Sequence, residues 1–188
     1  MLTIQECLTD KIKQYVYNWH TDRQFRSDRQ SERVSGVDAL FVPVNDDCGM
    51  KFFLSDDVAK ISYHLTAILS HIGYTPKAWG LTEITLENAK NILEPSIRVW
   101  CFMVEKCAVL GVVLDKKYGD GSSKLYKVMR RIDNRMEKRL SKYSSFSNCD
   151  GHAYNYGITK RGRIVCIDIG HLEGVEHGEK YKTLLKYL

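Results

Sequence analysis

Short β-prone apolar runs alternate with long amphipathic stretches along this chain, and this alternation limits the possible folds more than any other feature. The apolar runs cover residues 39–44, 50–54, 98–105, 154–158 and 163–169. Between them, apolar side chains recur at helical spacing over residues 55–72 and over a longer stretch that begins at Ser122 or Ser123. The predicted order is helix, hairpin, helix, strand, long helix and hairpin, a β-rich half joined by one strand to a helical half, so the pattern predicts an α+β fold in two lobes.

Composition excludes several classes of protein. The 188 residues are 44% hydrophobic and 27% charged, enough to bury a core and unlike a disordered or low-complexity chain. The longest apolar run, residues 108–114, is too short to span a bilayer, and residues 1–24 lack the apolar core of a secretory signal. Six cysteines occur without a C-x-x-C pair, which argues against a zinc knuckle. We therefore expect a cytoplasmic protein with reduced thiols and no membrane partner.

The local signals predict two hairpins and three helices. Apolar residues from Ile4 to Trp19 recur as in an amphipathic helix that fades into the polar residues 21–35. The turn-rich residues 45–49 separate the strands of a first hairpin, and Pro43 favours an edge position for its first strand. A second hairpin turns at residues 159–162.

Positive charge is concentrated in one segment. Residues 116–142 contain ten Lys and Arg against three acidic residues, a net of +7, whereas the whole chain carries +5. Such a helix could bind phosphate or an acidic protein, but a solvated helix face is the simpler interpretation. Nucleic acid binding through residues 116–142 is the weaker alternative.

Polar residues without an obvious structural role flank the second hairpin. Asp150 and Asn155 are spaced as D-x-x-x-x-N, with His152 between them, and Asp168 follows an apolar strand as I-D-I-G. A simpler interpretation is that Asp150 and Asn155 cap turns and Asp168 ends a strand. The combination of a long helix before the loop, a hairpin after it and D-x-G at its end nevertheless resembles the protein-kinase-like superfamily, in particular phage-encoded and aminoglycoside-kinase-type proteins.

Upstream residues extend this resemblance. Lys51 lies in the second strand of the first hairpin, before a helix, where the superfamily carries its phosphate-binding lysine. Strand alternation could instead turn Lys51 toward solvent. The strand ending at Glu105, with Cys107 just after it, resembles the hinge that binds adenine. The resemblance implies a truncated two-lobed kinase-like fold with a helical extension (1–33), an N-lobe-like part (34–107) and a reduced C-lobe-like part (108–188).

The resemblance also implies a chemistry with ATP and Mg²⁺ as cofactors. Asp168 and Asn155 would hold the metal ion, and Lys51 would neutralise the phosphates. Asp150 would orient the accepting hydroxyl and take its proton, while His152 would contact phosphate or brace the loop. Backbone groups near Glu105 and Cys107 would bind adenine.

Other features depart from the family pattern. A glycine-rich loop is missing, with only Gly36 before the first hairpin, and no glutamate lies in residues 55–72 to pair with Lys51. Only eighteen residues follow Gly170. The leading expectation is an ATP-dependent phosphotransferase, a minimal Ser/Thr protein kinase with a protein substrate or host protein partner. The alternative is a pseudokinase-like interaction or inhibitor protein with weak or no catalysis.

Overall fold

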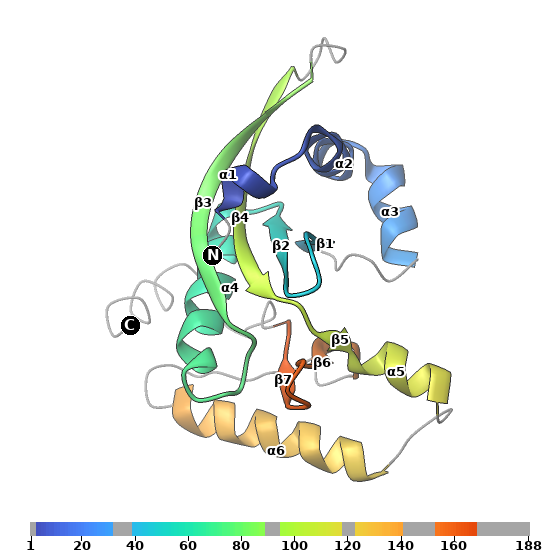
Figure 1. Cartoon of the computed structure of the whole chain (residues 1–188), viewed down its shortest axis with the longest axis vertical. Coiled ribbons are helices and arrows are strands. Elements are labelled where there is room, and N and C mark those ends of the chain that lie inside the picture. The colour runs from blue at the N-terminus through green and yellow to red at the C-terminus, as the bar shows by residue number, and fades with distance from the viewer. Residues whose placement is uncertain (1–2, 32–38, 89–94, 118–122, 141–152, 169–188) are drawn as a thin grey trace. The chain divides into compact units, whose positions relative to one another are not determined.

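The computed structural model describes residues 3–31, 39–88, 95–117, 123–140 and 153–168 (Figure 1). The chain divides into two compact units. The first unit comprises Met1–Tyr63 and Ala78–Lys106, and the second comprises His64–Lys77 and Cys107–Leu188. One boundary passes through helix α4 (Asp56–Ser70), and another separates Lys106 from Cys107. Both units combine helices with antiparallel strands, so the predicted α+β class is confirmed.

A four-stranded antiparallel sheet with the order β1-β2-β4-β3 forms the centre of the first unit (Figure 1). Its strands are β1 (Ala39–Pro43), β2 (Cys48–Phe53), β3 (Ala78–Glu87) and β4 (Ser96–Glu105). The predicted first hairpin is confirmed as β1 and β2, and Pro43 lies in an edge strand as expected. An edge position suits proline because its nitrogen cannot donate to a neighbouring strand.

Strand β3 is absent from the sequence-based prediction. Its alternation is interrupted where the register shifts between Trp79 and Thr82, and Gly80 lies there with a φ of 72°. A glycine with positive φ is a common component of such a bulge, because it adopts this conformation without steric cost. Only the second half of β3 alternates regularly between buried and exposed residues. An alternation over so few residues is too short to predict the strand from the sequence.

Both faces of the first unit's sheet are covered. Met50, Phe52 and Cys101 contribute to a core shared with α1 (Ile4–Cys7) and α2 (Asp10–Thr21). Phe53 and Phe102 contribute to a second core on the other side, together with Ala59 of α4. Because successive side chains of a strand point to opposite faces, every residue of β2 is buried. Its nearly continuous apolar sequence is the pattern expected of a strand covered on both sides.

The N-terminal segment forms three helices, where the sequence predicted a single one. The side chain of Thr3 caps α1 in a reciprocal pair with Glu6, and the Thr9 hydroxyl accepts a hydrogen bond from Ile12 N at 3.3 Å to begin α2. Each cap satisfies N–H groups that a continuous helix would have bonded internally, so the chain changes direction between Cys7 and Asp10. The polar residues that follow form α3 (Arg23–Ser31), although the sequence suggested that the helix would fade there.

The second unit contains a three-stranded antiparallel sheet with the order β5-β6-β7. Its elements are β5 (Ala108–Val109), α5 (Leu110–Lys117), α6 (Ser123–Leu140), the 3-10 turn η1 (Ala153–Asn155), β6 (Tyr156–Ile158) and β7 (Ile164–Cys166). The predicted long helix and second hairpin are confirmed as α6 and β6–β7. Helix α6 contacts β7 and buries Met129, Ile132 and Met136.

Within the described residues, no helix is both long and apolar enough to cross a membrane.

Candidate functional site

Lys51 is buried in the middle of β2, with only 9% of its surface exposed. It pairs with Phe41 of β1 and Phe102 of β4, and its Nζ lies 5.6 Å from the centre of the Phe53 ring. The interpretation that alternation turns Lys51 toward solvent is therefore wrong, because this sheet has no solvated face at β2. The structure places a positive charge beside aromatic rings on the face that α4 covers.

The segment predicted to be a hinge is held against the first hairpin. Lys106 N donates to the carbonyl oxygen of Asp47 at 2.9 Å, and Lys106 Nζ donates to that of Asn45 at 3.3 Å. The Asn45 side chain in turn accepts from the backbone N–H groups of Asp47 and Cys48 at 2.8 and 2.9 Å. The ordered turn therefore fixes the end of β4, where half-buried Glu105 pairs with Cys48.

Lys51 and Glu105 lie in the same unit and in adjacent strands. Lys51 is opposite Phe102, three residues before Glu105 in β4. At the rise of an extended strand, this register separates their Cα positions along the sheet by about 10 Å. Because the offset is an odd number of residues, the side chains of Lys51 and Glu105 point to opposite faces of the sheet.

Asn155 and Asp168 are brought together in the second unit. Tyr156 pairs with Cys166 at the open end of the β6–β7 hairpin, and Ile167 N donates to the carbonyl oxygen of Asn155 at 2.8 Å. Asn155 is buried, and Asp168 is half-buried. This backbone bond pairs Asn155 with Ile167, the residue just before Asp168. Asn155 and Asp168 are thirteen residues apart in sequence, and the bond brings their backbones close together.

Strand β7, which ends two residues before Asp168, also helps to position it. The thiol of Cys166, which is fully buried, donates to the backbone carbonyl oxygen of Asp168 at 3.3 Å. Cys166 N also donates to the carbonyl oxygen of Tyr74 at 2.8 Å, which ties the strand to the segment after α4 within the second unit. The chain just before Asp168 is thus bonded on two sides.

Cys107, the second predicted hinge residue, packs against the hairpin. A methyl group added at Gly157 would lie 2.6 Å from Cys107 Cβ and 2.8 Å from Ile167 Cγ2. Only glycine therefore lets Cys107 and Ile167 approach β6 this closely. Cys107, Asn155 and Asp168 thus belong to one packed group of the second unit, whereas Lys51 and Glu105 belong to the first.

Asp150 and His152, the predicted base and its neighbour in the loop, lie outside the described residues, as does Gly36.

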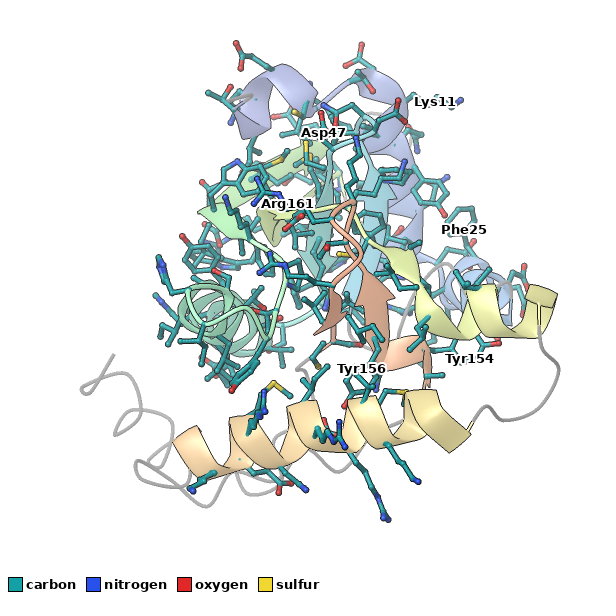
Figure 2. All side chains as sticks on the ribbon, turned by 60° about the horizontal axis from the view of Figure 1, so that its bottom comes forward. Lys11, Phe25, Asp47, Tyr154, Tyr156 and Arg161 are labelled. Atoms are coloured by element: carbon teal, nitrogen blue, oxygen red, sulfur yellow. The ribbon has the colours of Figure 1, made fainter. Side chains whose placement is uncertain are left out.

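Sequence reasoning missed a buried polar link beside Asn155. The hydroxyl of Tyr156, a fully buried residue that is labelled in Figure 2, donates to a carboxylate oxygen of Asp133 on α6. Burial, reinforced by this hydrogen bond, raises the pKa of Tyr156 far above its ordinary value. The one sequence signal was an acidic residue between the apolar positions of α6. The link fixes the long helix relative to the residue that follows Asn155.

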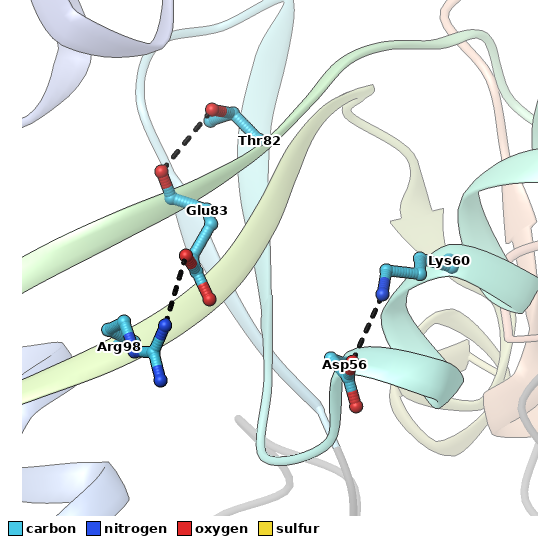
Figure 3. Close-up of polar contacts among 5 residues, drawn as sticks. All are labelled: Asp56, Lys60, Thr82, Glu83 and Arg98. Atoms are coloured by element: carbon cyan, nitrogen blue, oxygen red, sulfur yellow. Dashed lines mark hydrogen bonds and ion pairs between the residues drawn. The ribbon is translucent and has the colours of Figure 1, made fainter.

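The first unit also has an open cavity of about 740 Å³, whose lining includes His20, Glu83 and Arg98. Its charged side chains are engaged in ion pairs, Glu83 and Arg98 with each other and Asp56 with Lys60 from outside the lining (Figure 3). Lys60 Nζ lies 3.0 Å from Asp56 and also 4.7 Å from the centre of the Trp100 ring. Arg98 lies 3.9 Å from Glu83. Mutually neutralised charges at an exposed surface give this cavity no preference for a particular ligand charge.

The residues that could hold a divalent cation are few. Across the described parts of the chain, no three His, Cys, Asp or Glu side chains gather in a way that could hold a metal ion. Asn155 and Asp168 provide an amide and a carboxylate instead, both with the oxygen donors that Mg²⁺ prefers. Mg²⁺ commonly takes one or two protein ligands and completes its shell with phosphate and water, so two oxygen donors of this type are chemically sufficient for it.

Comparison with known proteins assigns no family. The chain matches no protein-family model, and no curated protein sequence is significantly similar to it.

Proposed function

We propose that this protein is an ATP- and Mg²⁺-dependent phosphotransferase of a minimal kinase-like fold, acting on a Ser or Thr hydroxyl of a protein. The observation that carries the proposal is the hydrogen bond from Ile167 N to the carbonyl oxygen of Asn155. It joins the end of the D-x-x-x-x-N segment to the residue before Asp168. Two oxygen donors of the type suited to Mg²⁺ are thereby held at one end of a hairpin.

The first unit supports the same proposal. Its β1–β2 hairpin carries Lys51 on the second strand and is followed by α4, the arrangement that the proposed small lobe requires. Lys51 lies in β2 on the face that α4 covers. A lysine held among aromatic rings presents a fixed charge to a phosphate oxygen, which is more effective than one carried on a mobile solvated chain.

The chemistry requires alignment and charge neutralisation more than covalent participation by the protein. Bound Mg²⁺ would neutralise charge on the phosphate oxygens. Asp168 and Asn155 would hold the metal ion, and Lys51 would contact the phosphates. Asp150 would accept the proton of the attacking hydroxyl as the oxygen–phosphorus bond forms and the bond to the nucleoside diphosphate breaks.

A second candidate function follows from α4. None of its fifteen residues is a glutamate, and its acidic residues, Asp56 and Asp57, lie in the first turn, where Asp56 pairs with Lys60. Because α4 carries no glutamate at the place where the resemblance expects the partner of the lysine, phosphate binding could persist while phosphoryl transfer is lost. The alternative is therefore a pseudokinase-like protein that acts by binding a partner.

The test is phosphate incorporation from labelled ATP by the full chain, with and without Mg²⁺, using the protein itself and a Ser/Thr-rich basic protein as acceptors. We expect Asp168→Asn, Lys51→Met and Asp150→Ala each to reduce the rate by at least about 100-fold, as loss of a preorganised electrostatic group does. Asp46→Asn, in the exposed turn of the first hairpin, is the matched control and should retain full activity.

Thermal unfolding separates the two candidates. A kinase should show Mg²⁺-dependent stabilisation by ATP that Asp168→Asn removes and Asp150→Ala leaves intact. Stabilisation without phosphate transfer would favour the pseudokinase-like alternative. If the native chain shows neither, or if Asp46→Asn is as impaired as Asp168→Asn, the proposed function is wrong.

A further inference from the structure

Helix α6 presents a row of cations on its exposed side. Between residues 127 and 138, six positions are exposed. Five of them are Lys or Arg and the sixth is an asparagine: Lys127, Arg130, Arg131, Asn134, Arg135 and Lys138. Figure 2 shows nitrogen-tipped side chains extending from the side of α6 that faces away from the β6–β7 hairpin. The two acidic residues of this stretch, Asp133 and Glu137, are half-buried instead.

The cations of this row repel one another. Lys127, Arg131 and Arg135 follow each other at intervals of four residues, so like charges are neighbours on the helix surface. Four of the five, including Arg130, make no ion pair or hydrogen bond to any part of the chain that the structure describes. Helix formation alone would favour acidic residues at these spacings, so an external anion is the natural partner of this row.

The opposite side of α6 is firmly anchored. Met129, Ile132 and Met136 are buried, and Asp133 accepts the hydrogen bond of Tyr156. The row is therefore a rigid surface that extends along twelve helical residues, an axial rise of about 16 Å from the first to the last. It does not have an apolar side available for insertion into a lipid surface.

We propose that this cationic row binds the phosphate backbone of double-stranded nucleic acid without sequence preference. A duplex carries about one charge per 1.7 Å of its axis, so about ten phosphates lie along the length of the row. Contacts of this kind fix the position of a protein on a duplex but do not read its sequence. The function is independent of phosphoryl transfer, since none of these side chains belongs to the candidate phosphotransferase site.

The composition of the row favours a duplex over other polyanions. None of its six exposed positions is aromatic, and binding of single strands relies on aromatic stacking. None is apolar either, whereas protein interfaces are anchored by buried aromatic and aliphatic side chains. Evenly spaced arginines and lysines suit a regular array of phosphates.

The test measures binding of the full chain to a fluorescent duplex of about 20 bp as a function of KCl. If four cations release counterions, the slope of log K against log salt should be about −3.6, a loss of about 150-fold in affinity between 50 and 200 mM. Arg131→Gln/Arg135→Gln should reduce the slope to about −1.8 and that loss to about 12-fold. Glutamine keeps a high helix propensity, so circular dichroism should show an intact helix.

Lys11→Gln/Lys13→Gln is the matched control, because it removes the same charge from exposed positions of α2. It should leave the slope unchanged. Two duplexes of unrelated sequence should bind within about threefold, as backbone contacts require. Equal weakening by both double variants, or no binding at 50 mM, would overturn the proposal. So would preferential binding of poly-glutamate or of the single strand at equal charge concentration.

Discussion

The two sheets of this protein bury polar groups in different ways. In the first unit, a four-stranded sheet is covered on both faces, and one lysine lies among large apolar side chains. In the second unit, the strands of the final hairpin have only three residues each. Their geometry depends on a close approach at Gly157 and on the bond between Tyr156 and Asp133.

The two units therefore differ in the kind of interaction that stabilises them. The first unit should owe its stability mainly to apolar area, with Lys51 tolerated because the surrounding sheet is extensive. The second unit has too little strand to be stabilised in that way. A few specific contacts hold Asn155 next to Asp168, so small changes there should disturb the candidate site.

The largest effect is expected from the core of the first unit. Phe52 is fully buried in the core shared with α1 and α2. Phe52→Ala should reduce the free energy of unfolding by about 3–5 kcal/mol, because it removes apolar contact and leaves a cavity. Urea unfolding measures the loss, and Phe41→Ala, at a half-buried position, should cost clearly less. An equal cost at the two positions would contradict the described core.

The second prediction concerns the polar link of the second unit. Tyr156→Phe should cost about 1.5–3 kcal/mol, the range for hydrogen bonds to charged groups, since the half-buried Asp133 loses its donor. Hydrogen exchange should show the loss of protection in α6 and β6–β7. Tyr74→Phe, at a half-buried position of the same unit, is the control and should be nearly neutral. Unchanged stability of Tyr156→Phe would show that the link is dispensable.

The third prediction concerns close packing at the hairpin. Gly157→Ala should cost about 1–3 kcal/mol, because the new methyl group would meet Cys107 Cβ at 2.6 Å and Ile167 Cγ2 at 2.8 Å. Gly162→Ala is the control. Gly162 has a φ of 75° and nothing within 4 Å of an added methyl group, so this change measures backbone strain without a packing clash. Cys107→Ala keeps the clashing Cβ atom and should not rescue Gly157→Ala, whereas Ile167→Ala removes Cγ2 and should partly rescue it. The absence of any rescue would argue against this contact.

The smallest expected effect is a loss of stability at alkaline pH that comes from Cys101, in the interior of the first unit. Burial raises the pKa of the Cys101 thiol from 9.0 to about 12. Above pH 9 the unfolded chain ionises this thiol while the folded chain does not, so stability falls as pH rises toward 12. Between pH 8 and 10 this one group should cost about 1.4 kcal/mol. Cys101→Ala should lose that part of the alkaline decrease in urea unfolding, whereas Cys107→Ala should keep it.

Much of the fold is predictable because periodicity directly reports burial. The β1–β2 hairpin, α4, the final part of β4, α6 and the β6–β7 hairpin follow from the sequence pattern. Strand β3 does not, because Gly80 and the register shift interrupt its alternation. The break between α1 and α2 escapes the pattern as well, since a threonine cap overrides a continuous apolar stripe.

The candidate site is only partly predictable. Motif spacing singled out Asn155 and Asp168, and the hairpin between them explains how they become neighbours. Lys51 could be chosen by its strand, but its burial depends on α4, which covers that face of the sheet, and on Phe41 and Phe102 in the flanking strands. The partner of Tyr156 could not be predicted, because a hydrogen bond between residues twenty-three apart has no periodic signature.

By itself, the sequence determined which segments form helices and strands over most of the described chain, and where charge accumulates on α6. These properties depend on neighbours within a few residues, through side-chain alternation, capping and turn geometry. Only the tertiary structure decided that Lys51 is enclosed, that Gly157 admits Cys107 and Ile167, and that Tyr156 reaches Asp133. Those contacts join segments distant in sequence, and the free energy that selects them comes from packing and desolvation, which no local pattern encodes.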